Sequence, residues 1–405
     1  MSFTLGVVLF ALGIGISIAL HEAGHMWSAK SFGMKVRRYY IGFGPKVFSF
    51  RRGETEYGLK WVPAGGFCDI AGMTALDPVT TDEAPRAFFR KATWKRVVVL
   101  SAGSGMHFLI GIVLLYILAV SSGLPADNTA ALAGRTACLP ATQDPVTLTL
   151  SPCDPKNPSP AARAGIKPGD KILSVAGTPT SSWPDVVNVI RSHAGPTPFV
   201  LERDGHQLTV TVDVATVQRA PLLAQPGHPN PLGPAGAIGL AQLTTQHYGP
   251  VGAVPATLRF TGQMFAATWQ GLIMFPEKVP AVLQAIGGAP PDLNRPVSVV
   301  GASIIGGDAV EQGAWSFFVL LLAALNFFVG VFNLVPLLPL DGGHIAVNLY
   351  ERVRDSVRRR LGKAKMPPVD YTRLLPVTYA FILVLGAISL LTITADIVNP
   401  IRLPQ

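Results

Sequence analysis

The chain has 405 residues and a formal net charge of +9; 49% of its residues are hydrophobic, 14% are charged, and its mean hydropathy is +0.39. Because soluble globular proteins carry roughly 25% charged residues, this composition excludes an ordinary soluble domain and indicates a membrane protein. The basic residues gather in two intervals, 30–96 and 352–373, and the stretch 123–311 between them is nearly balanced. Such alternation reflects membrane topology, so no nucleic-acid partner is expected.

Four apolar runs are long enough to cross a hydrocarbon core of about 30 Å as helices. They extend from Phe3 to Ala29, from Val97 to Leu124, from Trp315 to Leu340 and from Leu374 to Ile397. The first run has no basic segment before it, so it is interpreted as a retained span and not as a signal peptide. The positive-inside rule places both termini and the balanced loop outside the cytoplasm. We therefore expect a multi-pass protein of the cell's inner (plasma) membrane.

The first span carries His21-Glu22-Ala23-Gly24-His25, an HExxH motif near its inner end. Residues four apart share one face of a helix, so both imidazoles can bind one ion, and Zn²⁺ is the expected cofactor. Glu22 can act as general base on a zinc-bound water, whose pKa the metal lowers to about 7. Ionisable groups inside a membrane cost free energy, which metal binding would offset. The alternative is a polar cluster at a helix end without a function.

Residues 35–94 lie within the first basic interval and begin with a stretch rich in aromatic residues and glycine. Strands are predicted over 38–45 and 57–62, around a turn at 52–54. This hairpin fits either a re-entrant membrane element or a small cytoplasmic sheet.

The balanced loop contains a soluble module, predicted over 125–216. A helix over 183–192 precedes two strands, 199–203 and 207–212, which Asp204-Gly205 joins. This order fits an α+β PDZ domain, whose strand edge can bind an extended peptide; the alternative is a generic small β-rich domain. The Pro- and Gly-rich residues 220–249 are predicted to be a linker. The apolar residues 251–285 fit helices on the membrane surface, although packing in a core would give the same pattern.

The three cysteines show no metal-binding spacing. Cys68 falls in the first basic interval and is expected to be a free thiol. Cys138 and Cys153 fall in the loop outside the cytoplasm, where they form either a disulfide or two free thiols.

A catalytic zinc needs a third protein ligand and an open position for water. Leu340-Asp341-Gly342-Gly343 ends the third span on the inner side, at the depth expected for His21 and His25, so Asp341 is the candidate. The alternative for Asp341 is a helix-capping carboxylate before two glycines. His344, one turn further on, is a second candidate ligand that could instead face the basic loop.

These features together resemble the site-2 protease family of intramembrane zinc metalloproteases. The resemblance is carried by His21-Glu22-Ala23-Gly24-His25, by residues 333–343 (Asn-Leu-Val-Pro-Leu-Leu-Pro-Leu-Asp-Gly-Gly), by the four spans and by the single PDZ-like module. It covers essentially the whole chain and is closest to the actinobacterial type of regulator-of-sigma-factor protease with one PDZ domain. It implies that His21, His25 and Asp341 bind zinc, that Glu22 is the catalytic base, and that Asn333 contacts the substrate or the developing oxyanion.

The resemblance also implies a substrate element and a substrate class. Gly42-Phe43-Gly44 and Gly65-Gly66-Phe67 are similar to the family's membrane-associated β element, which pairs with unwound substrate. The implied substrates are single-pass membrane proteins such as anti-sigma factors, already shortened by a first cut outside the membrane. The PDZ domain would read a peptide or exclude untrimmed substrates by size.

One motif departs from the family pattern. The second span commonly reads Ala-Gly-Pro-x-x-Asn in such proteases, but here it reads Ala102-Gly103-Ser104-Gly105-Met106-His107. Ser104 replaces the proline and His107 the asparagine. His107 could hydrogen-bond near the site, compete for the metal, or serve only in packing.

Two other classes of function remain as alternatives. A membrane-anchored PDZ adaptor with a vestigial metal site would explain the architecture but not an intact set of ligands and base. A zinc-binding transporter would explain histidines within the membrane, yet transport does not require the glutamate of HExxH.

The predicted fold class is a polytopic α-helical membrane protein with about four transmembrane helices, a membrane-associated β-hairpin region and an inserted α+β PDZ domain. The predicted segments are 1–34 (first span with HExxH), 35–94 (cytoplasmic-side β region), 95–124 (second span), 125–216 (PDZ domain), 217–311 (linker and amphipathic surface helices), 312–345 (third span with Asp341), 346–373 (basic cytoplasmic loop) and 374–405 (fourth span and C-terminus). The active site is expected near the cytoplasmic side.

Overall fold

The computed structural model describes residues 1–74, 77–126, 131–224, 227–289, 292 and 294–403. The chain forms two compact units. The first consists of residues 1–120 together with 249–405, and the second of residues 121–248.

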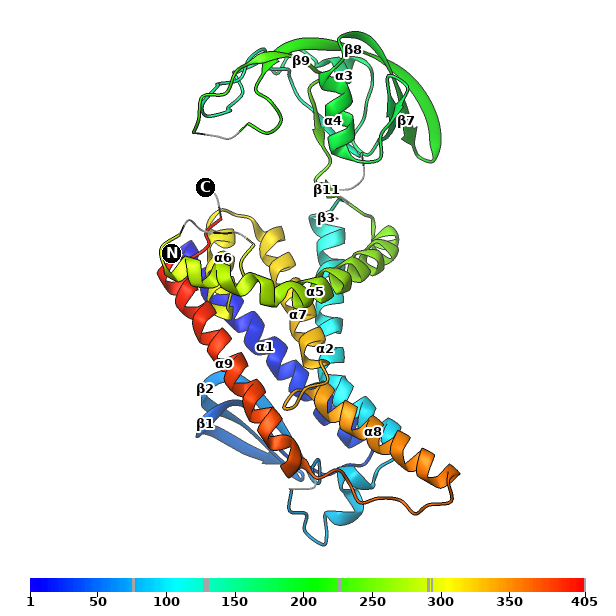
Figure 1. Ribbon diagram of the computed structural model, residues 1–405, viewed down its shortest axis with the longest axis vertical. Coiled ribbons are helices and arrows are strands. Elements are labelled where there is room, and N and C mark those ends of the chain that lie inside the picture. Colours follow the sequence, from blue (N-terminus) through cyan, green and yellow to red (C-terminus); the bar gives the residue numbers. More distant parts are fainter. Residues whose placement is uncertain (75–76, 127–130, 225–226, 290–291, 293, 404–405) are drawn as a thin grey trace. The chain divides into compact units, whose positions relative to one another are not determined.

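The first unit is built on four helices that are long and apolar enough to cross a membrane. They are α1 (Ser2–Ser31), α2 (Thr93–Ser121), α7 (Trp315–Asn333) and α9 (Leu375–Val398), with a mean hydropathy of 2.1 to 2.4 in their most apolar windows. The predicted four spans are thereby confirmed. The two chain ends lie at the same end of this helical unit, where the Arg402 guanidinium stands 4.9 Å from the centre of the Phe3 ring (Figure 1).

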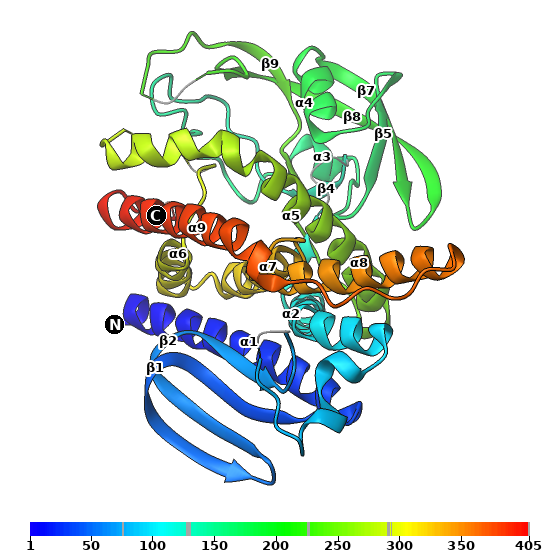
Figure 2. The same ribbon diagram turned by 60° about the horizontal axis from the view of Figure 1, so that its bottom comes forward.

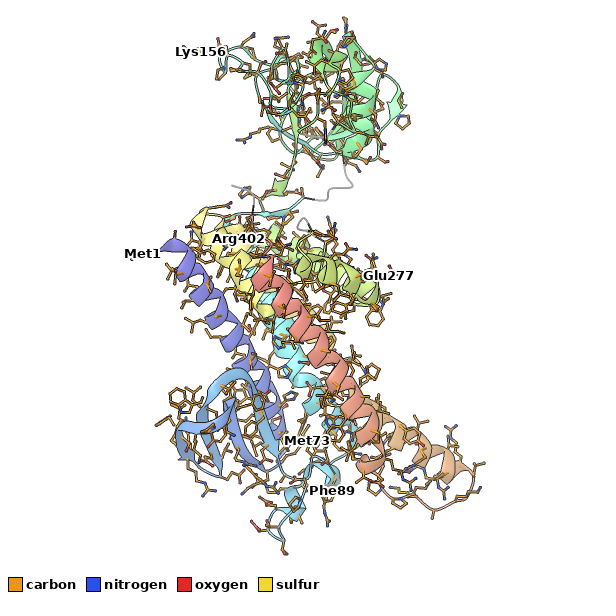
Figure 3. All side chains as sticks on the ribbon, turned by 60° about the vertical axis from the view of Figure 1, so that its left-hand side comes forward. Met1, Met73, Phe89, Lys156, Glu277 and Arg402 are labelled. Carbon is orange, nitrogen blue, oxygen red and sulfur yellow. A yellow bond between two sulfur atoms is a disulfide. The ribbon has the colours of Figure 1, made fainter. Side chains whose placement is uncertain are left out.

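Two further helices contact the spans. α5 (Pro250–Ile286), which carries Glu277, packs against α7 and α9, and α6 (Val299–Glu311) packs against α1, α7 and α9 (Figures 1 and 3). The prediction of helix over 251–285 is confirmed. Three prolines lie inside α5, at positions 255, 276 and 280, and several of its apolar side chains are exposed.

The third span is shorter than predicted. α7 ends at Asn333, and a turn over 334–340 leads into α8 (Asp341–Arg360). Pro336 and Pro339 explain the difference, because proline has no N–H to donate and its ring clashes within a helix. The predicted span to Leu340 was therefore wrong at its inner end, and the predicted basic loop 346–373 is largely helical. Asp341 stands in the first turn of α8, which is also where a carboxylate favours a helix.

The β region forms a curled sheet of two long antiparallel strands, β1 (Val36–Arg52) and β2 (Thr55–Ile70). They join through Gly53, whose φ of 62° suits the tight turn. The predicted strands and turn are confirmed, but both strands are longer than expected. Repeated register shifts bend them so far that Tyr39 pairs with both Cys68 and Tyr57. The stretch 38–41 is therefore the centre of the sheet, with β2 on both sides.

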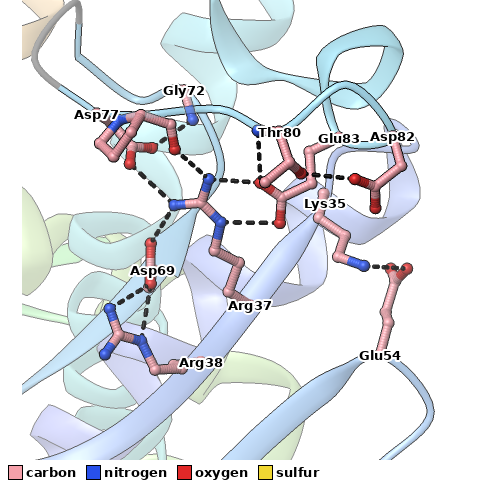
Figure 4. Close-up of polar contacts among 11 residues, drawn as sticks. Lys35, Arg37, Arg38, Glu54, Asp69, Gly72, Asp77, Thr80, Asp82 and Glu83 are labelled. Atoms are coloured by element: carbon pink, nitrogen blue, oxygen red, sulfur yellow. Dashed lines mark hydrogen bonds and ion pairs between the residues drawn. The ribbon is translucent and has the colours of Figure 1, made fainter.

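Ion pairs hold the segment after β2 against β1 (Figure 4). The Arg37 guanidinium donates to Glu83 at 2.6 Å and to Asp77 at 2.9 Å, and Lys35 pairs with Glu54 at 3.5 Å. The Arg37 hydrogen bonds hold the pKa of Glu83 at about 2, well below the usual value for a glutamate. Glu83 is therefore ionised throughout the physiological pH range, and this network holds the segment after β2 against β1.

The second unit contains a five-stranded sheet with the order β6-β5-β7-β8-β9. Its strands are β5 (Lys171–Val175), β6 (Thr178–Pro179), β7 (Gly195–Arg203), β8 (His206–Arg219) and β9 (Gly233–Ala237). Two helices, α3 (Pro160–Arg163) and α4 (Trp183–Arg191), accompany it. The predicted helix over 183–192 and the two predicted strands are confirmed. A capping box between Ser182 and Asp185 explains where α4 begins.

The predicted linker over 220–249 was wrong, because this segment completes the second unit. It supplies β9, β10 (Leu240–Gln242), which pairs with β4 (Ala133–Thr136), and β11 (Thr245–Gln246), which pairs with β3 (Leu124–Pro125). Its glycines serve close packing: a side chain on Gly236 would collide with the carbonyl oxygens of Ile190 and His193. An edge strand such as β9 also tolerates proline.

The structure decides between the two alternatives expected for Cys138 and Cys153. Cys138 and Cys153 form a disulfide, and Cys68, on β2, is a free thiol.

A buried ion pair joins α9 to the segment before α6. Arg295 donates to Asp396 at 2.7 Å, and both side chains are fully buried. Asp396 also accepts from the backbone N–H of Ser298 at 2.6 Å, and Arg295 donates to the carbonyl of Asn399 at 2.8 Å. A buried pair of this kind is costly to break, because removing one partner leaves the other charge uncompensated.

Replacing the carboxylate should therefore destabilise the protein strongly. We expect Asp396→Leu to lower the free energy of unfolding by about 3–5 kcal/mol, and Arg295→Met/Asp396→Leu to regain much of this loss. Thermal unfolding of the purified full chain in detergent measures both effects, with Glu277→Gln on α5 as a control. A double variant as unstable as the single one would contradict this account of the pair.

Candidate metal centre

Three side chains from two distant parts of the chain meet inside the first unit. His21 and His25 lie one turn apart on α1, and Asp341 comes from the first turn of α8. The two Nε2 atoms are 3.2 Å apart, and each lies 3.4 Å from Asp341 Oδ2. Both histidines are buried, with 8% and 6% of their surface exposed. The structure thus brings together the three side chains that the sequence predicts.

A hydrogen bond to the backbone fixes the orientation of the His25 ring. Its Nδ1 lies 2.8 Å from the backbone carbonyl oxygen of Val99 on α2. A carbonyl oxygen can only accept, so Nδ1 carries the proton and Nε2 presents a lone pair toward His21 and Asp341. Histidines that bind metals typically donate their other ring N–H in this way. The contact therefore sets the tautomer that metal binding requires.

The spacing of these atoms fits a zinc ion. Tetrahedral zinc has ligand distances of about 2.0–2.1 Å, which places neighbouring ligand atoms about 3.3–3.4 Å apart. The three separations of 3.2, 3.4 and 3.4 Å match this value. In addition, Asp341 Oδ2 is buried and has no hydrogen-bond partner within the described part of the chain. A buried carboxylate oxygen normally requires a partner, and a shared cation would supply one. Among the described residues, this is the one group of three such side chains close enough to hold a metal.

Helix α2 closes the site through a glycine. A Cβ atom on Gly103 would lie 2.6 Å from His21 Cε1, 2.7 Å from His21 Nε2, and closer still to His25 Nε2. Separations under 3.0 Å are not tolerated, so this position leaves room for the two imidazoles only as glycine. Sequence reasoning quoted Gly103 as part of a motif but gave it no role. The run of small residues from 102 to 105 was the available signal for close packing.

Glu22 faces the β region. A Cβ on Gly66 would lie 3.0 Å from Glu22 Cγ. The predicted substrate segment Gly65-Gly66-Phe67 on β2 therefore runs directly beside the predicted base.

The other predicted substrate segment lies next to the first. Gly42 and Gly44 on β1 have φ angles of 86° and 83°, a conformation that favours glycine and bends the strand around Phe43. The Phe43 and Phe67 rings stack with their centres 6.3 Å apart, and Phe43 is 46% exposed. Asn333 is the last residue of α7, before the turn to Asp341, and is partly exposed. Their roles toward substrate remain predictions.

His107 hydrogen-bonds beside the metal centre. It is buried, its Nδ1 lies 2.9 Å from Asn326 Oδ1 on α7, and its ring centre is 5.0 Å from that of His21. Asn326 Nδ2 donates to the carbonyl of Leu322 at 2.9 Å, which turns its oxygen toward His107. Sequence reasoning missed Asn326, although a buried amide in an apolar span is itself a functional signal.

Ser104 is fully buried on α2. The Nδ1 atom of His344 lies 3.4 Å from the Tyr371 hydroxyl oxygen. His344 does not belong to the cluster of His21, His25 and Asp341.

Four apolar spans, a curled sheet and a buried His–His–Asp cluster with an adjacent glutamate define a membrane-embedded metallopeptidase. In agreement, residues 9–369 match the model of peptidase family M50, and the chain belongs to this family. The predicted relationship to site-2 proteases is thereby confirmed.

The chain is similar over its entire length to curated members of the family. It is 49% identical to zinc metalloprotease Rip1 of Mycobacterium bovis (strain BCG / Pasteur 1173P2), 48% to that of Mycobacterium tuberculosis (strain ATCC 25618 / H37Rv), and 45% to that of Mycolicibacterium smegmatis. In each comparison the match covers 100% of both chains.

The tight fit at Gly103 predicts a specific loss of metal. We expect Gly103→Ala to lose most of its zinc, because the added methyl group would occupy the space of the two imidazoles. Gly105→Ala, on the same helix, is the matched control, since nothing lies within 4 Å of the added Cβ. Zinc content per purified protein, from elemental analysis, measures the effect. Equal zinc in both variants would show that α2 does not close the site as described.

Proposed function

We propose that this chain is an intramembrane zinc metalloprotease that hydrolyses peptide bonds within transmembrane segments of single-pass membrane proteins. The observation that carries the proposal is the near-tetrahedral spacing of His21, His25 and Asp341, with Glu22 between the two histidines in sequence and β2 next to Glu22 at Gly66. Membership of peptidase family M50 supports the same conclusion. The adaptor and transporter alternatives receive no support, because neither requires this combination.

His21, His25 and Asp341 would hold the zinc ion, and Val99 would keep His25 in its binding tautomer. When bound, zinc polarises a carbonyl group and lowers the pKa of a coordinated water to about 7. Glu22 would accept the proton of the attacking water on its carboxylate and deliver it to the leaving amine nitrogen.

The β region would position the substrate. A peptide bond in a helix has its backbone groups paired internally, so the substrate must unwind before attack, and its freed N–H and C=O groups then need new partners. Gly65, Gly66 and Phe67 run beside Glu22, and glycine at position 66 lets β2 lie close to Glu22, because a Cβ there would lie 3.0 Å from Glu22 Cγ. Addition of the substrate as a strand, with Gly42, Phe43 and Gly44 shaping the neighbouring bend, would supply these partners. Asn333 would contact the substrate or the developing oxyanion.

The second unit would act as a PDZ domain that filters or reads substrates. Its sheet and α4 agree with the predicted order of elements, and a cavity of about 310 Å³ lies beside α4, lined by Trp183, Val187 and Ile190 and by residues 236–241. An extended peptide could bind there.

The substrates would be anti-sigma factors or similar single-pass proteins, already trimmed outside the membrane. The positive-inside pattern places both termini and the second unit outside the cytoplasm, and the active site near the cytoplasmic side of the plasma membrane.

Removal of the base should separate metal binding from catalysis. We expect Glu22→Gln to retain zinc but to cleave a transmembrane-helix substrate about 100- to 10,000-fold more slowly, since an amide cannot accept the proton. Glu311→Gln, at the exposed end of α6, is the control for the same chemical change. Cleavage is followed on gels with purified protein in detergent, and zinc by elemental analysis. If Glu22→Gln cleaved as fast as the unmodified chain, the proposed function would be wrong.

A further inference from the structure

Helix α8 exposes an apolar stripe that the protein fold does not cover. Leu349, Val353, Val357 and Leu361 follow one another at intervals of four residues, along α8 and at its C-cap, and are 47%, 61%, 51% and 65% exposed. At 100° per residue these positions form one face. Yet α8 is not among the candidate spans, because its polar and charged residues are too many for a bilayer core.

The opposite face of α8 is the one that packs against the protein. The first turn of α8 is covered as well, because Ile345, four residues before Leu349, packs against a core cluster that includes Val99 and Leu100 of α2. Asn348 is buried, and Glu351 pairs with Arg96 of α2 at 3.7 Å. Figure 2 shows α8 extending from the helices beside the end of α2, and Figure 1 agrees. The apolar stripe is therefore unused by the fold and faces away from it.

Arginines flank the stripe on both sides. Between residues 349 and 365, seven basic residues stand against two acidic ones. On one side, Arg354 and Arg358 donate to the carbonyls of Pro367 and Ala364. On the other side, the guanidinium groups of Arg352 and Arg359 make no hydrogen bond or ion pair within the described part of the chain, and both residues are exposed. Strong donors therefore stand free beside an exposed apolar surface.

We propose that α8 is a docking surface for anionic lipid headgroups, lying in the interface of the membrane with its stripe toward the acyl chains. An amphipathic helix with arginines beside its apolar face is the pattern that binds such surfaces, and guanidinium groups suit phosphate oxygens. The connection to the bilayer is direct, because the chain enters the next candidate span at Tyr371. A nucleic acid would match the arginines but would leave the stripe in water. The first residue of this docked helix is the metal ligand Asp341.

Spin labels can measure the depth of α8 directly. Val353→Cys and Val357→Cys place a label in the stripe, and Ala364→Cys places one in the exposed segment after the helix. The full chain is labelled and reconstituted into phosphatidylcholine nanodiscs with and without phosphatidylglycerol. The unmodified chain, whose free thiol is Cys68, gives the background label. Collisions with oxygen and with a water-soluble nickel complex then report immersion in lipid or in water.

We expect the labels at 353 and 357 to lie in the acyl region of the phosphatidylglycerol nanodiscs and the label at 364 to lie in water. Arg352→Gln/Arg359→Gln should lower the ratio of docked to undocked α8 roughly 30-fold in these nanodiscs. Lys156→Gln/Lys171→Gln, which removes two exposed charges from the second unit, should leave it unchanged. Zinc content confirms that each variant has folded around its metal.

Two outcomes would overturn the proposal. Labels at 353 and 357 as exposed to the nickel complex as the label at 364 would show that the stripe does not meet lipid. Immersion that is equal with and without phosphatidylglycerol, and unaffected by Arg352→Gln/Arg359→Gln, would show that anionic headgroups are not what α8 binds. Neither readout depends on cleavage, so the proposed protease activity is tested separately.

Discussion

The structure depends on one interaction: the Asp341 carboxylate is held against the imidazoles of His21 and His25 inside an apolar helical bundle. Such groups are expensive in a membrane unless each is paired, and a cation shared among His21, His25 and Asp341 satisfies all three at once. The requirement acts on the backbone as well. α1 must approach α2 closely enough for Val99 to reach His25, which Gly103 permits, and the turn after α7 must deliver Asp341 to the same point.

The same constraint links the metal centre to the segment that we propose binds substrate. Glu22 lies between the two histidines in sequence, so its side chain leaves α1 in a different direction from theirs. It contacts β2 at Gly66. The curling of β1 and β2 brings residues 65–67 to this position, with the stacked rings of Phe43 and Phe67 beside it. Proton transfer and strand pairing would thus occur on adjacent sides of one side chain. On the far side of the metal centre, α8 carries Asp341 outward to the surface that we assign to anionic lipid.

Much of this could be predicted from the sequence, for identifiable reasons. Apolar runs define the spans because the bilayer tolerates little else, and HExxH places two ligands on one helical face by spacing alone. Asp341 followed from the depth expected for the end of the third span, although α7 in fact stops at Asn333. The prediction required only that this carboxylate lie near that end, and the structure brings it to the two imidazoles. Interactions across elements could not be predicted: the carbonyl of Val99, the packing at Gly103, and the bond between His107 and Asn326 depend on tertiary contacts. The prediction of a linker over 220–249 was wrong for a similar reason. The glycines and prolines of this segment allow close packing and an edge strand, and they do not make it a flexible connection.

The central claim is that one zinc ion is bound jointly by α1 and α8. X-ray absorption at the zinc edge of the purified full chain tests it most directly. The account predicts nitrogen and oxygen neighbours at about 2.0–2.1 Å, with the outer-shell pattern of two imidazoles. A sulfur neighbour at about 2.3 Å, which among the free thiols would implicate Cys68, or the signature of a single imidazole, would contradict it.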